Sequence, residues 1–465
     1  MTKQLIFLLL FISSQVFGQG YKIKIKLPQA ANKKVSLAYN YISSVYIQDT
    51  TLLDENGFGV WQGDSIIPQG LYKVYLDKDN HFDFLLGADQ QFTISNNSFK
   101  ADQMQIEGSE ETAEFVKYLL FFEDLKKQSA ELNAKLKASS AEKEKSELTE
   151  DLKELTTSLH AYWETIGEKL PNSFLYLFVK ANYVPSLDIS ELPIEIQEDD
   201  SLLFQARFSF QRQHYWDNFD YTDERFLFTP FYKNKLETWY TNVLYPAYDS
   251  VKPYVYKFLE DVKPNKRIFQ YATSFFLNSS INSNIMGMDA LFVDLANDFY
   301  FSGEAFWATE ESMKKIRENV LFKKDNLIGN IAPDLTLESF DGEFVNLHQI
   351  DAELTILLIY EPNCSHCKVF VPEFYKEVYL PNKDKGLEVY AIYSMDNKEE
   401  WEEFLNKHNL FDWINVWDEH HDSRFKITYD ARETPGVFVL DKDKKIIAKK
   451  MTVEQLQEIV KDKLN

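Results

Sequence analysis

The sequence predicts a multi-domain protein with an N-terminal antiparallel β-sandwich, a central all-α region and a C-terminal α/β fold. Three observations indicate this division. Short runs before Glu107 alternate polar and apolar residues with a period of two, which is typical of half-buried strands. Leucines recur at helical spacing after Ser109, and strand and helix patterns alternate after about Asp325. We expect domains at residues 19–107, 108–324 and 325–465, preceded by a cleaved segment at 1–18.

The cleaved segment has the three parts of a secretory signal peptide. Lys3 supplies the positive charge, Leu5–Ile12 is an unbroken apolar run, and small residues lead to a cut before Gln19. No Cys follows the apolar run, so we expect no lipid anchor at this signal. The run is shorter than the ~20 residues that cross a bilayer. We therefore expect an exported, soluble protein without a membrane span.

Composition and charge exclude some classes of partner. The chain has 465 residues, with 50 Lys and Arg against 73 Asp and Glu, and a formal net charge of −23. Nucleic-acid binding depends on a basic surface that displaces counterions, and adsorption to anionic lipid also needs basic clusters. We expect neither partner. At 45% hydrophobic and 15% aromatic residues, the chain has enough apolar material for large cores.

The expected β-sandwich comes first along the chain. Tyr21–Leu27 and Val35–Tyr39 alternate with a period of two, and Asn56–Gly57 marks a turn. Leu71–Leu76 and Phe82–Leu86 follow after a second turn. Short strands at this spacing indicate an antiparallel sandwich. The region carries no catalytic motif.

The helical region opens with a strong start signal. Ser109 is a good N-cap, and Glu110 and Glu111 place acids at the positive end of the helix dipole. Ser139–Ser140 predicts a break that turns the first long helix into a helical hairpin. The stretch from 201 to 310 is rich in aromatic residues, which we assign mainly to core and interdomain packing.

The C-terminal region alternates strands and helices. A hairpin with a tight turn at Asp341–Gly342 is expected first. Leu354–Tyr360 is continuously apolar, as expected for a strand buried on both faces. A helix is expected from Ser365. The later elements are expected at strand 387–393, helix 398–408, strand 436–440, strand 445–450 and helix 453–463.

Chemistry concentrates at the junction of that buried strand and its helix. Cys364 and Cys367 are the two cysteines of the chain, separated by Ser365 and His366. A cysteine at a helix N-terminus is favoured as the thiolate by free N–H groups and by the dipole, and His366 can add positive charge. We expect Cys364 to be the exposed nucleophile and Cys367 the buried resolving thiol of a reversible disulfide.

Cys364-x-x-Cys367-Lys368-x-x-x-Pro372 resembles the active-site helix of the thioredoxin superfamily. Thr434–Pro435, just before the strand at 436–440, resembles the superfamily's cis-proline loop, which docks an extended substrate segment. The segment 329–347 is similar to the opening hairpin of the TlpA/ResA and AhpC/TSA branch. The order of the domains resembles exported multi-domain proteins of Gram-negative bacteria.

The resemblance implies a thioredoxin-like fold and a periplasmic thiol–disulfide oxidoreductase. Its catalytic residues are Cys364, Cys367 and His366, its substrate-binding residues are Thr434 and Pro435, and it needs no cofactor and no metal. Its partners are protein thiols or disulfides and a redox partner that recycles it, and self-association is possible. Thioredoxins carry Trp at the position of Asn363 and a buried acid at that of Leu358. His366 in the second position between the cysteines resembles DsbA-type oxidants, whereas the surrounding scaffold resembles TlpA-type reductases, so the direction of electron flow stays open.

Four alternatives remain. In the first, the two cysteines form a purely structural disulfide, although a bridge that closes so short a loop constrains little of the unfolded chain. In the second, the cysteines bind copper or zinc, and His366 and the run 419–422 (Glu-His-His-Asp) offer further ligands. In the third, the domain is a peroxidase, although the Thr expected before the cysteine is absent. In the fourth, the chain is a binding or scaffold protein with a secondary redox domain.

Overall fold

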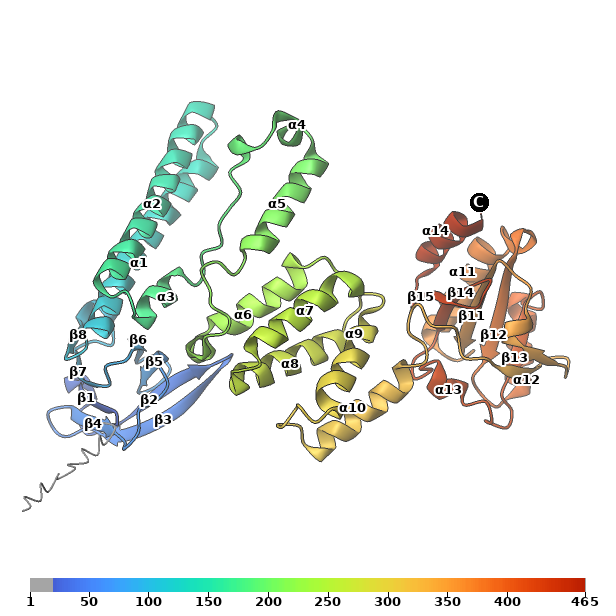
Figure 1. Cartoon of the computed structure of the whole chain (residues 1–465), viewed down its shortest axis with the longest axis horizontal. Helices are drawn as coiled ribbons and strands as arrows, with labels where there is room; N and C mark the ends of the chain where they lie inside the picture. The colour runs from blue at the N-terminus through green and yellow to red at the C-terminus, as the bar shows by residue number, and fades with distance from the viewer. Residues whose placement is uncertain (1–19, 465) are drawn as a thin grey trace, which may run out of the picture. The chain divides into compact units, whose positions relative to one another are not determined.

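The computed structural model describes residues 20–464. The chain divides into two compact units, and the division falls between Leu244 and Tyr245. The predicted signal peptide lies outside the described residues. Within the described residues, no helix is long and apolar enough to cross a membrane. The boundary falls inside the helical region expected at 108–324, so both units contain helices (Figure 1).

The first unit opens with the expected sandwich of two four-stranded sheets, with strand orders β4-β1-β7-β8 and β3-β2-β5-β6. Strand pairs are antiparallel except β1 and β7, which run parallel. Side chains of β1 alternate between buried and exposed, which is the period of two that predicted it. The strands are β1 Lys22–Lys26, β2 Lys34–Tyr41, β3 Ser44–Leu52, β4 Phe58–Gln62, β5 Gly70–Tyr75, β6 His81–Leu86, β7 Gln91–Asn96 and β8 Met104–Glu107.

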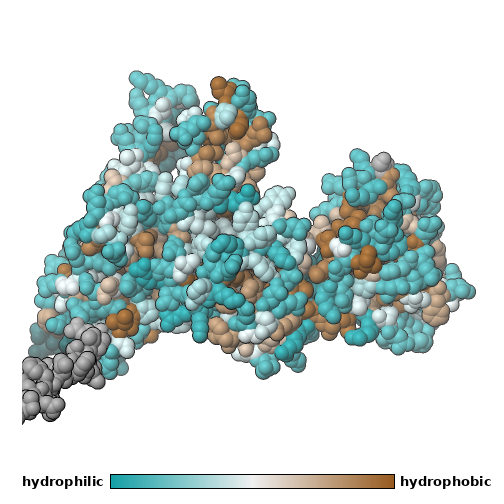
Figure 2. Space-filling view, viewed as in Figure 1, coloured by the Kyte–Doolittle hydropathy of each residue, from teal (hydrophilic) through white to brown (hydrophobic). Residues whose placement is uncertain are grey.

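The helices of the first unit begin as the sequence predicted. Ser109 caps α1 by accepting a hydrogen bond from the backbone N–H of Thr112, and α1 and α2 form a hairpin broken at residues 139–141. In α5 no residue is fully buried, and the brown patch near the top of Figure 2 lies over α4 and α5. The helices are α1 Glu110–Ala138, α2 Glu142–Lys169, α3 Phe174–Lys180, α4 Ile194–Gln197, α5 Asp200–His214 and α6 Phe231–Thr238.

The second unit joins four helices to the C-terminal α/β domain. The segment from α7 to α10 packs through aromatic and aliphatic side chains, including the buried Phe258, Phe276 and Phe292. Helix α10 leads directly into the α/β domain. The helices of this segment are α7 Tyr248–Val262, α8 Lys266–Ile281, α9 Met288–Leu295 and α10 Glu310–Lys323.

The α/β domain is built on one seven-stranded sheet with strand order β10-β9-β13-β12-β11-β14-β15. Every residue of β11 is buried, as predicted, because β11 lies inside the sheet and apolar clusters cover both of its faces. The elements are β9 Thr336–Ser339, β10 Phe344–Asn346, β11 Leu354–Tyr360, α11 Ser365–Phe374, β12 Leu387–Tyr393, α12 Lys398–His408, β13 Ile414–Trp417, α13 Phe425–Thr428, β14 Gly436–Asp441, β15 Ile446–Lys449 and α14 Val453–Leu464.

The architecture agrees with the predicted fold class. The described residues contain an N-terminal β-sandwich, a central helical region and a C-terminal α/β domain. The parallel β1–β7 pair is a local departure from a purely antiparallel sandwich. The three-domain boundaries stay a prediction.

Candidate active site

The first cysteine lies between the end of strand β11 and the start of helix α11. The strand ends at Tyr360, and Cys364 is the N-cap residue of α11. The backbone N–H of Cys364 donates to the carbonyl of Glu361 (3.2 Å), which closes the turn between strand and helix. Cys364 is partly exposed and Cys367 is fully buried, and both are free thiols. The first cysteine therefore faces solvent at the positive end of a helix dipole.

Strand pairing brings the proline loop to the same place. β14 runs antiparallel to β11 with Gly436 opposite Ile359, so the residues just before β14 lie beside the residues just after β11. These are Thr434 and Pro435, which are joined by a cis peptide bond. The thiol of Cys364 donates to the backbone carbonyl of Thr434, with 3.3 Å between sulfur and oxygen.

The surroundings of Cys364 favour its thiolate. Partial burial acts to raise the pKa of the thiol, but hydrogen bonds from the Thr434 side chain and from the backbone N–H groups of Cys367 and His366 outweigh it and lower the pKa to about 7. The two N–H groups belong to the first turn of α11 and have no carbonyl partner inside the helix. A substantial fraction of Cys364 is therefore ionised at neutral pH.

The second cysteine has the opposite character. Cys367 is 0% exposed and packs in the core beside Leu358 and Tyr360. Burial, aided by the neighbouring Cys364, raises the pKa of the Cys367 thiol to about 11. A buried thiol with a high pKa stays protonated and unreactive until a partner sulfur comes within its reach.

The structure thus brings together four of the five predicted site residues. Cys364, Cys367, Thr434 and Pro435 form one cluster, whereas the side chain of His366 is exposed. Leu358 is completely buried where thioredoxins carry an acid. The catalytic roles of Cys364, Cys367 and His366 stay predictions. The substrate-binding roles of Thr434 and Pro435 also stay predictions.

Other residues around the cysteines were not identified from the sequence. The side-chain amide of Asn363 donates to Glu400 of α12, and the hydroxyl of Ser394 donates to the Glu361 carboxylate (3.3 Å). Both bonds join segments more than thirty residues apart in the chain. No local pattern marks such pairs, so only the fold reveals them.

The alternative metal ligands lie elsewhere. His420 and His421 are exposed, and His421 lies 3.2 Å from Asp396. Among residues 20–464 no three His, Cys, Asp or Glu side chains are grouped so that they could hold a metal ion. The run 419–422 is therefore separate from the two cysteines, and the structure does not assemble the ligand set that the sequence alternative would need.

Comparison with known proteins places the C-terminal domain. The family model for the AhpC/TSA family matches residues 328–449, which contain Cys364, Cys367 and Thr434–Pro435. Comparison with curated protein sequences gave no match.

Several solved structures are similar to parts of the chain. A domain of a possible thiol-disulfide isomerase from Cytophaga hutchinsonii is 37% identical, with 29% of this chain and 92% of that chain covered and a TM-score of 0.28. A thioredoxin-like protein from Bacteroides caccae is 20% identical, with 60% and 98% covered and a TM-score of 0.46. The thioredoxin domain of a thiol-disulfide oxidoreductase from Bacteroides vulgatus is 23% identical, with 30% and 98% covered and a TM-score of 0.28. Through its residues 328–449, the chain belongs to the AhpC/TSA family of thioredoxin-like proteins.

Proposed function

We propose that this protein is an exported thiol–disulfide oxidoreductase that reduces disulfides in other proteins. One observation carries the proposal. A partly exposed thiol with a pKa of about 7 lies one helical turn from a buried thiol with a pKa of about 11, beside a cis-proline loop. This asymmetry assigns one sulfur to attack and the other to resolution.

The first step is attack on the substrate. The Cys364 thiolate attacks one sulfur of the substrate disulfide, so that a new S–S bond joins Cys364 to the substrate and the old S–S bond breaks. The leaving sulfur departs as a thiolate and takes a proton from solvent. The Thr434 carbonyl, 3.3 Å from the Cys364 sulfur, marks the backbone beside which an extended substrate segment lies.

The second step is resolution. The Cys367 thiol loses its proton, and its sulfur attacks Cys364, forming the Cys364–Cys367 disulfide and releasing the second substrate sulfur as a thiolate, which is protonated. Two electrons pass from the cysteine pair to the substrate. A partner dithiol must then supply two electrons and two protons to return the pair to the reduced form. These steps use no metal or cofactor.

The pKa of Cys364 supports electron transfer from the cysteine pair to the substrate. A strongly oxidising pair stabilises its reduced form with a nucleophile pKa near ~3.5, whereas thioredoxin has a nucleophile pKa of ~7. The pKa of Cys364 is about 7. The sequence offers an exposed His366 between the cysteines, as in DsbA-type oxidants, but the local hydrogen bonds support a reductase.

The cellular setting rests on the N-terminal sequence. Residues 1–18 have the pattern of a cleaved signal, which supports export to the periplasm. There the protein would meet disulfide-bonded proteins and a redox partner that recycles it. The proposal also allows self-association through the β and helical segments.

The test uses two cysteine variants of the full chain and an oxidised protein substrate such as insulin. We expect Cys364→Ser to abolish reduction and to form no mixed disulfide. We expect Cys367→Ser to attack once and to accumulate the mixed disulfide, visible by mass spectrometry as one substrate chain per protein. Retention of turnover by Cys364→Ser would contradict the proposal and would favour a binding or scaffold role.

A further inference from the structure

The loop that carries the cis proline is anchored at one end by the sheet. It runs from the end of α13 at Thr428 to the start of β14 at Gly436. Gly436 is held in the ladder opposite Ile359 of β11. That pairing fixes the C-terminal end of the loop beside Cys364, and it leaves the N-terminal end to be held by other contacts.

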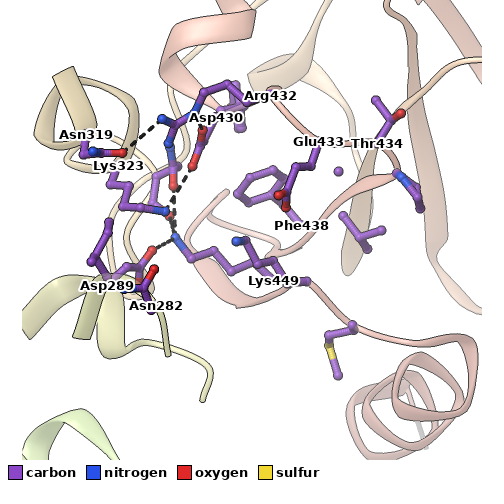
Figure 3. A pocket seen from close by; sticks show the side chains of 18 of the residues that line it. Asn282, Asp289, Asn319, Lys323, Asp430, Arg432, Glu433, Thr434, Phe438 and Lys449 are labelled. Carbon is purple, nitrogen blue, oxygen red and sulfur yellow. Dashed lines mark hydrogen bonds and ion pairs between the residues drawn. The ribbon is translucent and has the colours of Figure 1, made fainter. Parts of the chain in front are cut away.

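Helix α10 and the residues that follow it hold the other end. The side-chain amide of Asn326 donates to the Thr428 carbonyl (2.8 Å), and the ammonium of Lys323 lies 3.1 Å from the Asp430 carboxylate. The guanidinium of Arg432 donates to the Asn319 side chain (3.0 Å). Figure 3 shows Asn319, Lys323, Asp430 and Arg432 converging in this way.

A cavity adjoins this loop and the helices that bond to it. The cavity has a volume of about 620 Å³ and is lined by Thr434 and Pro435 on one side and by residues of α9, α10 and β15 on the others (Figure 3). A void of this size removes the close apolar packing that normally positions a loop. The side-chain bonds from α10 are then the contacts that fix where the loop lies.

Asp430 is the centre of these bonds. Its carboxylate accepts from Arg432 and pairs with Lys323, and the Lys323 and Asp430 side chains are 8% and 11% exposed. Burial acts to raise the pKa of Asp430, but Arg432 and Lys323 outweigh it and lower the pKa. The Asp430 carboxylate therefore stays ionised at neutral pH, and solvent screens its interaction with Lys323 little.

We infer that Asp430 is a positioning residue that helix α10, through Lys323, holds in place so that the Thr434–Pro435 loop is preorganised for a polypeptide disulfide. This inference rests on the proposed function and assigns part of the substrate site to the helical segment. A polypeptide needs the loop backbone at a defined position, whereas a small disulfide needs only the exposed Cys364 sulfur. Loosening the loop therefore slows reaction with polypeptides selectively, since misplacement of about 1 Å can cost ~100-fold in rate.

The experiment compares two reactions of the reduced full chain. One is with insulin and the other with the small reagent 5,5′-dithiobis(2-nitrobenzoate). We expect Lys323→Met to lower the rate constant with insulin about tenfold while the rate constant with the small reagent changes less than about twofold. Lys323→Arg keeps the charge and should restore most of the insulin rate.

The matched control lies on the same helix. Lys315 pairs with Glu311 at 2.8 Å, and these side chains are 70% and 80% exposed, whereas the pair of Lys323 and Asp430 is nearly buried. Lys315→Met should change neither rate. Thermal unfolding of each variant shows whether it is folded. If Lys323→Met is not, Asn319→Ala removes the contact to Arg432, together with a hydrogen bond to the Lys315 carbonyl within α10, and should give a smaller loss, about threefold, in the insulin rate alone.

Two outcomes contradict the inference. A folded Lys323→Met or Asn319→Ala protein in which both rate constants stay at their wild-type values overturns it. An equal loss of both rates also overturns it, because it would place the effect on the Cys364 sulfur itself. Failure of the wild-type protein to reduce either disulfide would instead overturn the proposed function, and the two failures are thereby distinguished.

Discussion

Cys364 and Cys367 lie one helical turn apart but in opposite environments. Cys364 is partly exposed at the N-terminus of α11, where two backbone N–H groups and the Thr434 side chain favour its thiolate. Cys367 is enclosed in the core, where burial favours its neutral thiol. The difference in pKa is the physical basis for assigning attack to the first sulfur.

The first prediction concerns alkylation of the reduced protein. Below its pKa of about 7, the rate of reaction of Cys364 with iodoacetamide should rise about tenfold per pH unit, because the thiolate is the nucleophile, and it should level off above pH 8. Cys367 should stay unmodified at pH 7. Quenched time points analysed by mass spectrometry check this, and Cys364→Ser should lose the fast reaction. A midpoint near the ordinary thiol value of ~8.5 would contradict the assigned environment.

The second prediction concerns resolution. Leu358 is buried beside Cys367, so the strand offers no carboxylate there to take the Cys367 proton. Burial, the main cause of the high pKa of Cys367, persists in the mixed disulfide. We expect the rate of resolution, measured by stopped-flow release of the substrate thiol, to rise with pH from 7 to 10, after attack has reached its plateau. A resolution rate independent of pH would show that another group accepts the proton.

At the scale of single residues, the sequence predicts site residues that belong to local motifs. It does not predict residues that only the fold brings into contact. The pairing of Cys364 with Cys367 and the loop at Thr434–Pro435 could be expected from spacing and resemblance. The pair Lys323–Asp430 spans 107 positions, and neither residue lies in a motif. An ion pair of this kind depends on where α10 meets the loop, which no local pattern encodes.

At the scale of elements, hydrophobic periodicity is most reliable where burial is strong. The strand at 387–393 and the helix at 398–408 occur at the predicted bounds, because each has a clear buried face. The sequence analysis did not identify β3, since it is an edge strand whose side chains are mostly exposed. The parallel pairing of β1 with β7 was also not predicted, because alternation defines a strand but not its neighbour.

The third prediction concerns helix α6. Lys235 is 6% exposed, and its ammonium has no hydrogen-bond partner among residues 20–464. The ammonium lies 5.0 Å from the ring centre of Tyr215 and 5.5 Å from that of Phe219. Burial lowers the pKa of Lys235 to about 8. Between pH 8 and the unfolded pKa of lysine, ~10.4, the unfolded chain binds more protons than the folded chain, so the free energy of unfolding rises with pH over this range. Below pH 8 Lys235 is charged in both states, and the full cost of burying its charge lowers the stability.

We therefore expect Lys235→Met to increase the free energy of unfolding at pH 7 by about 1–2 kcal/mol, because the loss of cation–π attraction offsets part of the gain. The gain should shrink as the pH rises from 8 to about 10.4. Urea unfolding of the full chain measures both. Lys233→Met is the control, since Lys233 lies on the same helix and pairs with Glu237 at 38% and 44% exposure. A loss of stability in Lys235→Met would show that the ring contacts dominate.

The whole molecule carries a net charge of −23, which acts on the approach of charged substrates. A field of this sign attracts cationic partners and repels anionic ones, and salt screens it within ~10 Å at 0.1 M. The fourth prediction is that a lysine-rich disulfide peptide reacts faster than a glutamate-rich one, by about tenfold at low ionic strength. Stopped-flow rates at rising NaCl should converge, and a constant ratio would place the selectivity in contacts near the cysteines.

The sequence predicts one helical region at 108–324, and its boundaries stay a prediction. The chain divides into two compact units between Leu244 and Tyr245, inside this region. Helices on both sides of that point have the same aromatic-rich composition, and composition does not show which core a helix joins. The fold class of each part follows from local periodicity, whereas the partition of the helices follows from tertiary packing.

The reduction potential of the Cys364–Cys367 pair tests the central claim most directly. The purified full chain is equilibrated in dithiothreitol or glutathione buffers of graded ratio, and the fraction of disulfide is measured after acid quenching. The proposed reductase should show a reversible two-electron couple near ~−270 mV, in accord with a nucleophile pKa of about 7. A value near ~−120 mV would make the protein an oxidant, and the absence of a reversible couple would contradict a redox function altogether.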